Sequence, residues 1–231
     1  MHSIKTIAFD ADDTLWVNEP LFRINEEKFD SLLKNYISDD QITAKLYDTE
    51  IRNLKHFGYG IKGFIISMIE TAIELTKGEI KGCDLKKIID WGKEQIEHPV
   101  NVLDDVEKVL EALNGKYKLM IITKGDLFDQ ESKIARSGLA DYFDIIEIVS
   151  EKDEATYSSL MKKHNLNPSE LLMIGNSLKS DILPLVKLGA KAIHIPFHTT
   201  WVHEEISTKD LGSTNHITVN KIIDVLEILQ K

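Results

Sequence analysis

Hydrophobic residues follow two different patterns along the chain, and the change between them marks two kinds of structure. A short apolar run at 4–9 is typical of a buried strand. From about 18 to 98 the apolar residues recur at helical spacing instead, and no segment resembles a buried strand. This block predicts about four helices, including one over 64–76 and one over 85–97.

From about residue 103 the pattern alternates between helix and strand. Helices are expected over 106–113 and 128–137. The apolar strands are expected at 118–123, 144–149, 171–174, 192–195 and 217–219. Such alternation predicts a parallel sheet wrapped by helices, with ligands at the carboxyl ends of the strands. The helical block therefore reads as one insertion after the first strand.

Carboxylates follow the first strand directly. Asp10 and Asp12 are spaced by one residue, and the hydroxyl of Thr14 comes next. Acidic groups at the end of a buried strand repel one another, so this spacing favours a bound cation. A solvated acidic turn after an edge strand is the alternative interpretation.

The next two strands also end in polar residues. Thr123, Lys124 and Gly125 offer a hydroxyl and a glycine that lets backbone amides approach an anion, although such a sequence also caps helices. Lys152 follows the strand after that, and a lone lysine there is normally a solvated residue at a helix start.

The strand at 171–174 is followed by Gly175 and Asn176, and Asp181 comes soon after. An amide and a carboxylate on one short turn could hold a cation, and capping is an equally good interpretation. Each signal is weak alone. Because all of them occupy equivalent places on one sheet, together they indicate a ligand site.

These strand ends resemble the four ordered motifs of the haloacid dehalogenase-like hydrolase superfamily. The matching residues are Asp10-Ala11-Asp12-Asp13-Thr14, Thr123, Lys152 and Gly175-Asn176-Ser177 with Asp181. The helical insertion is similar to the cap that the family's phosphatases, phosphomutases and dehalogenases carry at this point. The resemblance implies an α/β fold with a Rossmann-like core at 1–17 and 102–231 and an all-helical cap at 18–101.

The resemblance also implies catalytic roles. Asp10 would be a nucleophile that forms an aspartyl-phosphate, and Asp12 would protonate the leaving alcohol and then activate water. Thr123, with Lys124 and Gly125 beside it, would hold phosphoryl oxygens, while Lys152 would offset their negative charge.

A magnesium ion is implied at the same place. Its ligands would be the Asp10 side chain, the Asp12 carbonyl and the fourth motif, with Asp181 and Asn176. Phosphatase members usually carry an aspartate at the position of Asn176. An asparagine carbonyl can still bind Mg²⁺ or a bound water but brings one charge less; alternatively, Asn176 orients the turn without touching metal.

The predicted function is hydrolysis of a small phosphomonoester metabolite by a magnesium-dependent phosphatase. Three alternatives stay open. A 2-haloacid dehalogenase should not need Asp12 or metal, so the presence of Asp12 argues against it. A phosphomutase would share every core residue, so the sequence does not distinguish it from a phosphatase. A non-catalytic binding protein of this fold would not need Asp10, Asp12, Thr123 and Lys152 together, so the intact set argues against it.

Composition narrows the possible partners and location. The 231 residues include 28 basic and 38 acidic side chains, a balance of −10 that argues against a broad nucleic-acid footprint. No apolar run is long enough to span a membrane, and the first residues lack the charged and then apolar pattern of a signal peptide. The single cysteine, Cys83, excludes an internal disulfide, so a cytoplasmic protein is expected. The sequence carries no signal for oligomeric state.

Overall fold

The computed structural model describes residues 3–38, 41–199, 201, 204 and 215–230. The chain divides into two compact units. The core unit comprises Met1–Glu19, Val100–Lys124 and Glu131–Lys231, and the helical unit comprises Pro20–Pro99 and Gly125–Gln130.

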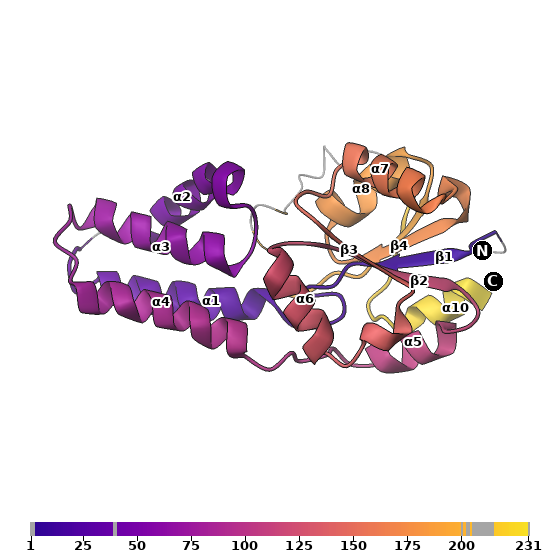
Figure 1. Cartoon of the computed structure of the whole chain (residues 1–231), viewed down its shortest axis with the longest axis horizontal. Coiled ribbons are helices and arrows are strands. Elements are labelled where there is room, and N and C mark those ends of the chain that lie inside the picture. Colours follow the sequence, from indigo (N-terminus) through magenta and orange to yellow (C-terminus); the bar gives the residue numbers. More distant parts are fainter. Residues whose placement is uncertain (1–2, 39–40, 200, 202–203, 205–214, 231) are drawn as a thin grey trace. The chain divides into compact units, whose positions relative to one another are not determined.

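A parallel sheet forms the centre of the core unit (Figure 1). Within the described residues its strands are β1 (Thr6–Phe9), β2 (Lys118–Lys124), β3 (Ile145–Val149), β4 (Leu171–Gly175), β5 (Lys191–His194) and β6 (Ile217–Thr218). Their order is β3-β2-β1-β4-β5-β6, and every neighbouring pair is parallel. The predicted α/β fold is therefore confirmed.

The register places the strand ends together. Phe9 at the end of β1 pairs with Ile121 of β2 on one side and with Ile174 of β4 on the other. Since all three strands run the same way, the polar residues that follow them come out at one edge of the sheet.

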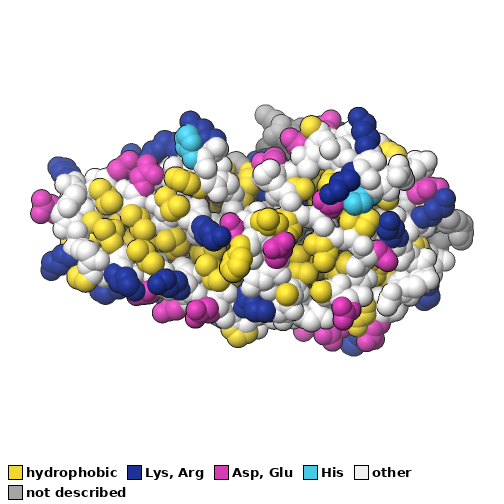
Figure 2. Space-filling view, viewed as in Figure 1, with side chains coloured by type: hydrophobic (Ala, Val, Ile, Leu, Met, Phe, Trp, Pro, Cys, Tyr) yellow, Lys and Arg dark blue, Asp and Glu magenta, His cyan; other side chains and the backbone are white. Residues whose placement is uncertain are grey.

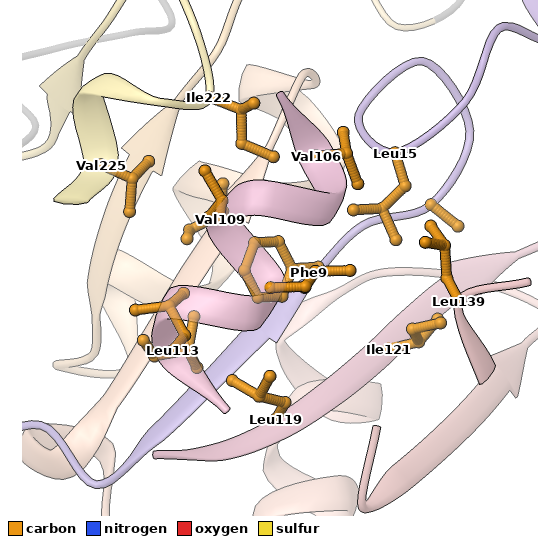
Figure 3. Packing of buried hydrophobic residues seen from close by; sticks show 14 of the residues in the cluster. Phe9, Leu15, Val106, Val109, Leu113, Leu119, Ile121, Leu139, Ile222 and Val225 are labelled. Atoms are coloured by element: carbon orange, nitrogen blue, oxygen red, sulfur yellow. The ribbon is translucent and has the colours of Figure 1, made fainter. Parts of the chain in front are cut away.

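Helices cover both faces of the sheet. They are α5 (Val106–Leu113), α7 (Glu154–His164), α8 (Leu183–Lys187) and α10 (Asp224–Gln230), and α6 (Leu127–Arg136) is shared with the helical unit. Side chains of β1 alternate between faces: Ile7 and Phe9 join one buried cluster, and Ala8 joins the other. Figure 3 shows Phe9 packed beside α5, with Leu119 and Ile121 of β2 in the same cluster.

Within its described residues the helical unit contains four main helices, in line with the number of about four expected from the spacing of apolar residues. They are α1 (Glu19–Leu33), α2 (Ile42–Phe57), α3 (Ile61–Leu75) and α4 (Gly82–Glu97). Their core includes the buried side chains of Phe29, Leu33, Met68 and Ile88. The segment 125–130 also belongs to this unit, which the sequence pattern did not predict.

The segment that leaves the core unit at 15–17 lies beside the segment that returns to it at 101–103. The Val17 N–H donates to the Asn101 carbonyl at 3.0 Å, and the Leu103 N–H donates to the Leu15 carbonyl at 2.9 Å. The chain thus leaves and re-enters the core unit at adjacent points, as an insertion requires. The limits 18–101 for a cap domain stay a prediction.

The charged side chains of the surface and the hydropathy of the helices bear on possible partners. Basic and acidic side chains are interspersed on the face shown in Figure 2. Among the helices that the structure describes, none is both long and apolar enough to cross a membrane.

Candidate active site

Three charged side chains from three strand ends meet in the interior of the core unit. Asp10 follows β1, Lys152 follows β3 and Asp181 follows β4. Their residues are 7%, 4% and 1% exposed, respectively. Lys152 Nζ donates to Asp10 Oδ1 and, at 2.7 Å, to Asp181 Oδ1. One ammonium therefore joins two buried carboxylates.

Burial sets the electrostatics of this triad. It raises the pKa of Asp10, and the neighbouring Asp181 carboxylate raises it further, while Lys152 opposes both effects. Burial alone would lower the pKa of Lys152, but the two carboxylates hold it well above its usual value. When both carboxylates are ionised, the triad carries a net negative charge, which favours a further cation at this edge of the sheet.

Asn176 lies close to the first motif. Thr14 Oγ1 donates to Asp10 Oδ2 at 3.0 Å and approaches Asn176 Oδ1 at 3.4 Å. The fourth motif also fixes Asp181 through its backbone, since the Ser177 N–H donates to Asp181 Oδ2 at 2.9 Å. The structure thus brings Asp10, Asn176 and Asp181 into one cluster.

Asp12 is held by partners that the sequence analysis did not identify. Lys133 Nζ, on α6, lies 2.7 and 2.9 Å from its two carboxylate oxygens, and Trp16 Nε1 donates to Asp12 Oδ1 at 2.7 Å. Lys133 also reaches Asn18 Oδ1 at 3.2 Å. No local pattern marks Lys133, because it is one of several charged residues on its helix.

The residues expected to bind phosphate lie at the carboxyl end of β2, and each has a different environment. Thr123 is 1% exposed. The ammonium of Lys124 pairs with Glu204 at 2.6 Å, a partner that the sequence did not predict. Gly125 has a φ of 154°, and a Cβ atom there would lie 3.1 Å from the Gln130 side chain, so the chain path at this turn requires glycine.

Asp13 holds the start of α1, a role that the sequence did not predict. Its φ is 60°, a conformation that aspartate tolerates better than most residues. Its carboxylate accepts backbone N–H groups of Asn18 at 2.8 Å and Glu19 at 2.9 Å. Burial raises the pKa of Asp13 to about 7, against the opposing effect of these hydrogen bonds.

The oxygen donors of the cluster suit magnesium. Carboxylates and an amide carbonyl are hard ligands, and Mg²⁺ is usually held by one or two carboxylates, several waters and the substrate phosphate. Within the described part of the chain, no group of three or more His, Cys, Asp or Glu side chains could hold a metal by itself. A site with Asp10 and Asp181 fits that sparse coordination.

Comparisons with known proteins place the chain in a family. Residues 4–189 match the family of haloacid dehalogenase-like hydrolases. A solved haloacid dehalogenase-like family hydrolase from Xanthomonas campestris is 43% identical, with a TM-score of 0.81 over 86% of this chain and 84% of that chain. The chain belongs to the haloacid dehalogenase-like hydrolase family, as predicted.

Curated relatives indicate the reaction class. N-acylneuraminate-9-phosphatase of Mus musculus is 27% identical over 172 residues, which are 70% of this chain and 65% of the mouse protein. The Homo sapiens protein of the same name is 23% identical over 98% of this chain and 94% of its own length. Both relatives are named as phosphatases, which is the class predicted for this chain, and the chain spans just under two thirds of the mouse protein.

Gly175 leaves the space that Asp181 occupies, which gives the first prediction. A Cβ atom on Gly175 would lie 2.3 Å from Asp181 Oδ2 and 2.6 Å from its Cβ atom, so Gly175→Ala must displace this carboxylate. Because small displacements of catalytic groups can cost on the order of a hundredfold, we expect hydrolysis of a phosphomonoester to fall by about that factor.

Gly82→Ala is the matched control, since nothing lies within 4 Å of a Cβ atom there. Circular dichroism and thermal unfolding of both variants will separate lost activity from lost folding. Normal turnover by a folded Gly175→Ala protein would show that the position of Asp181 does not matter for the reaction.

Proposed function

We propose that this protein is a magnesium-dependent phosphatase that hydrolyses a small phosphomonoester through an aspartyl-phosphate on Asp10. The observation that carries the proposal is the buried cluster in which Lys152 joins Asp10 and Asp181, with Asp12 two residues from the nucleophile. The phosphatase names of the curated relatives support the same chemistry.

In the first step a carboxylate oxygen of Asp10 attacks phosphorus, and the bond to the leaving oxygen breaks. Thr14 donates to Oδ2 of Asp10, which orients the carboxylate. Lys152 offsets the charge of the transferring group, since a phosphate dianion otherwise repels a carboxylate. Thr123 supplies a hydroxyl for a phosphoryl oxygen.

Asp12 serves both halves of the reaction in this proposal. It gives a proton to the departing alkoxide in the first step, and in the second it takes a proton from the water that attacks phosphorus and frees Asp10. Lys133 and Trp16 hold its carboxylate beforehand. To act as the acid, Asp12 must therefore turn from these donors toward the leaving group and take up a proton from solvent, and the proton it later takes from the attacking water restores that form.

Mg²⁺ would be held by the Asp10 side chain, the Asp12 carbonyl, Asp181 and Asn176, and when bound it would neutralise charge on the phosphoryl oxygens. Asn176 adds an oxygen but no charge. Asp10 and Asp181 would therefore supply the anionic part of the site.

The helical insertion at 18–101 would act as a cap that selects the substrate and excludes water. The core residues contact only the phosphoryl group and the leaving oxygen in this proposal, so discrimination among metabolites would come from the cap. A small phosphorylated metabolite is the expected substrate.

A dehalogenase is the second candidate, because solved dehalogenases share this fold: one from Pseudomonas syringae is 20% identical with a TM-score of 0.64. That likeness concerns the fold alone. Asp12, held by Lys133 and Trp16, favours the phosphatase, since protonating an alkoxide requires an acid and releasing a halide does not.

A screen of phosphorylated metabolites with and without Mg²⁺ tests the proposal. We expect phosphate release that depends on Mg²⁺ and is abolished in Asp10→Asn, because this nearly isosteric change removes the nucleophile. Chloride release from a 2-haloacid, measured in parallel, reports the alternative. Phosphate release by a folded, undeamidated Asp10→Asn protein would contradict the covalent mechanism.

The metal site gives a separate prediction. Asp181→Ala should raise the Mg²⁺ concentration for half-maximal rate by on the order of tenfold or more, because it removes one of two anionic ligands. Asn176→Asp should lower it, since it adds a charge, although its extra repulsion of the substrate can reduce kcat. Asp141→Ala, at an exposed position, is the control. An unchanged Mg²⁺ dependence in Asp181→Ala would remove the fourth motif from the metal site.

A further inference from the structure

Glu204 lies outside all four motifs, yet its carboxylate accepts hydrogen bonds from residues at two of them. Its side chain is 12% exposed. Oε1 accepts from Lys124 Nζ at 2.6 Å, and Oε2 accepts from Ser177 Oγ at 2.5 Å and Ser180 Oγ at 2.6 Å. Although burial opposes ionisation, Lys124 and the two hydroxyls lower the pKa of Glu204 to about 2, so it is a carboxylate at neutral pH.

These three donors come from the two strands that flank the nucleophile. Lys124 is the last residue of β2, and the two serines follow β4. In the sheet, β2 and β4 lie on either side of β1, which leads into Asp10. Glu204 thus connects the second motif to the fourth across the strand that carries the nucleophile.

The ammonium of Lys124 lies beside the turn that holds Asp181. It donates to Ser180 Oγ at 3.2 Å, and Ser180 directly precedes Asp181. Its second carboxylate, Glu151, lies 3.4 Å away on a side chain that is 46% exposed, so water screens that attraction. Among the two carboxylates that the described residues place beside Lys124, Glu204 is the more buried one, so it compensates the ammonium charge more strongly.

We propose that Glu204 is a positioning residue for the cation site: by pairing with Lys124 it keeps that ammonium from competing with a bound divalent cation at Asp181. The inference rests on the proposed metal-dependent function. It adds that a third carboxylate, outside the four motifs, sets the affinity for metal without contacting it.

Removing the charge of Glu204 should therefore weaken metal binding through Lys124. Glu204→Gln keeps the shape of the side chain but removes this buried negative charge from beside the Lys124 ammonium. With less compensation, the charge of Lys124 then repels a divalent ion more strongly and can pair with Asp181. If the role were only to tie the serines in place, removing Lys124 as well would not restore binding.

The test measures binding of Mn²⁺ to the full chain without substrate, by electron paramagnetic resonance of the free ion. We expect the Kd to rise about tenfold in Glu204→Gln and to return to within about twofold of the wild-type value in Glu204→Gln/Lys124→Met. Glu154→Gln, which breaks the exposed pair with Lys187, is the matched control and should bind as the wild type does.

Two results would overturn the inference: an unchanged Kd in Glu204→Gln, or a double variant that binds no better than the single one. If Glu204→Gln does not fold, the double variant is compared with Lys124→Met. Equal affinity of these two supports the proposal, and weaker binding by the double variant contradicts it. A wild-type protein that does not bind Mn²⁺ would contradict the proposed metal site itself.

Discussion

The buried ion triad of Lys152, Asp10 and Asp181 is the interaction on which the active-site edge of the core unit depends. Two carboxylates next to each other in the interior repel, and the ammonium that they share offsets this repulsion. Removing one partner of such a buried pair typically costs about 3–5 kcal/mol, because it leaves an uncompensated charge. The same three residues have central roles in the proposed reaction.

The sheet explains why these residues meet. Parallel strands have their carboxyl ends at one edge of the sheet, and the order β3-β2-β1-β4 places β1, which leads into Asp10, between β2 and β4. Alternation along β1 sends Phe9 into one buried cluster and Ala8 into the other, so the strand is anchored on both faces. A rigid strand end of this kind limits the movement of Asp10.

The sequence predicted much of this arrangement because its signals are local. Apolar runs that end in Asp10, Thr123 or Gly175 are visible without a structure, and they identified the fold class and the family. Lys133 and Glu204 were not predictable, since each acts on a residue more than 50 positions away and neither belongs to a local pattern. The pairing of Lys124 with Glu204 also shows that a residue beside a motif can have a carboxylate partner that spacing does not reveal.

The most direct test of the account is to look for the phosphoryl group on the nucleophile. Asp12→Asn should still attack p-nitrophenyl phosphate, whose leaving group needs no proton, but should activate water poorly, so the intermediate should accumulate. Acid quenching followed by peptide mass mapping should then locate one phosphoryl group on Asp10. Release of p-nitrophenol with the phosphoryl group on another residue, or on none, would contradict the covalent mechanism.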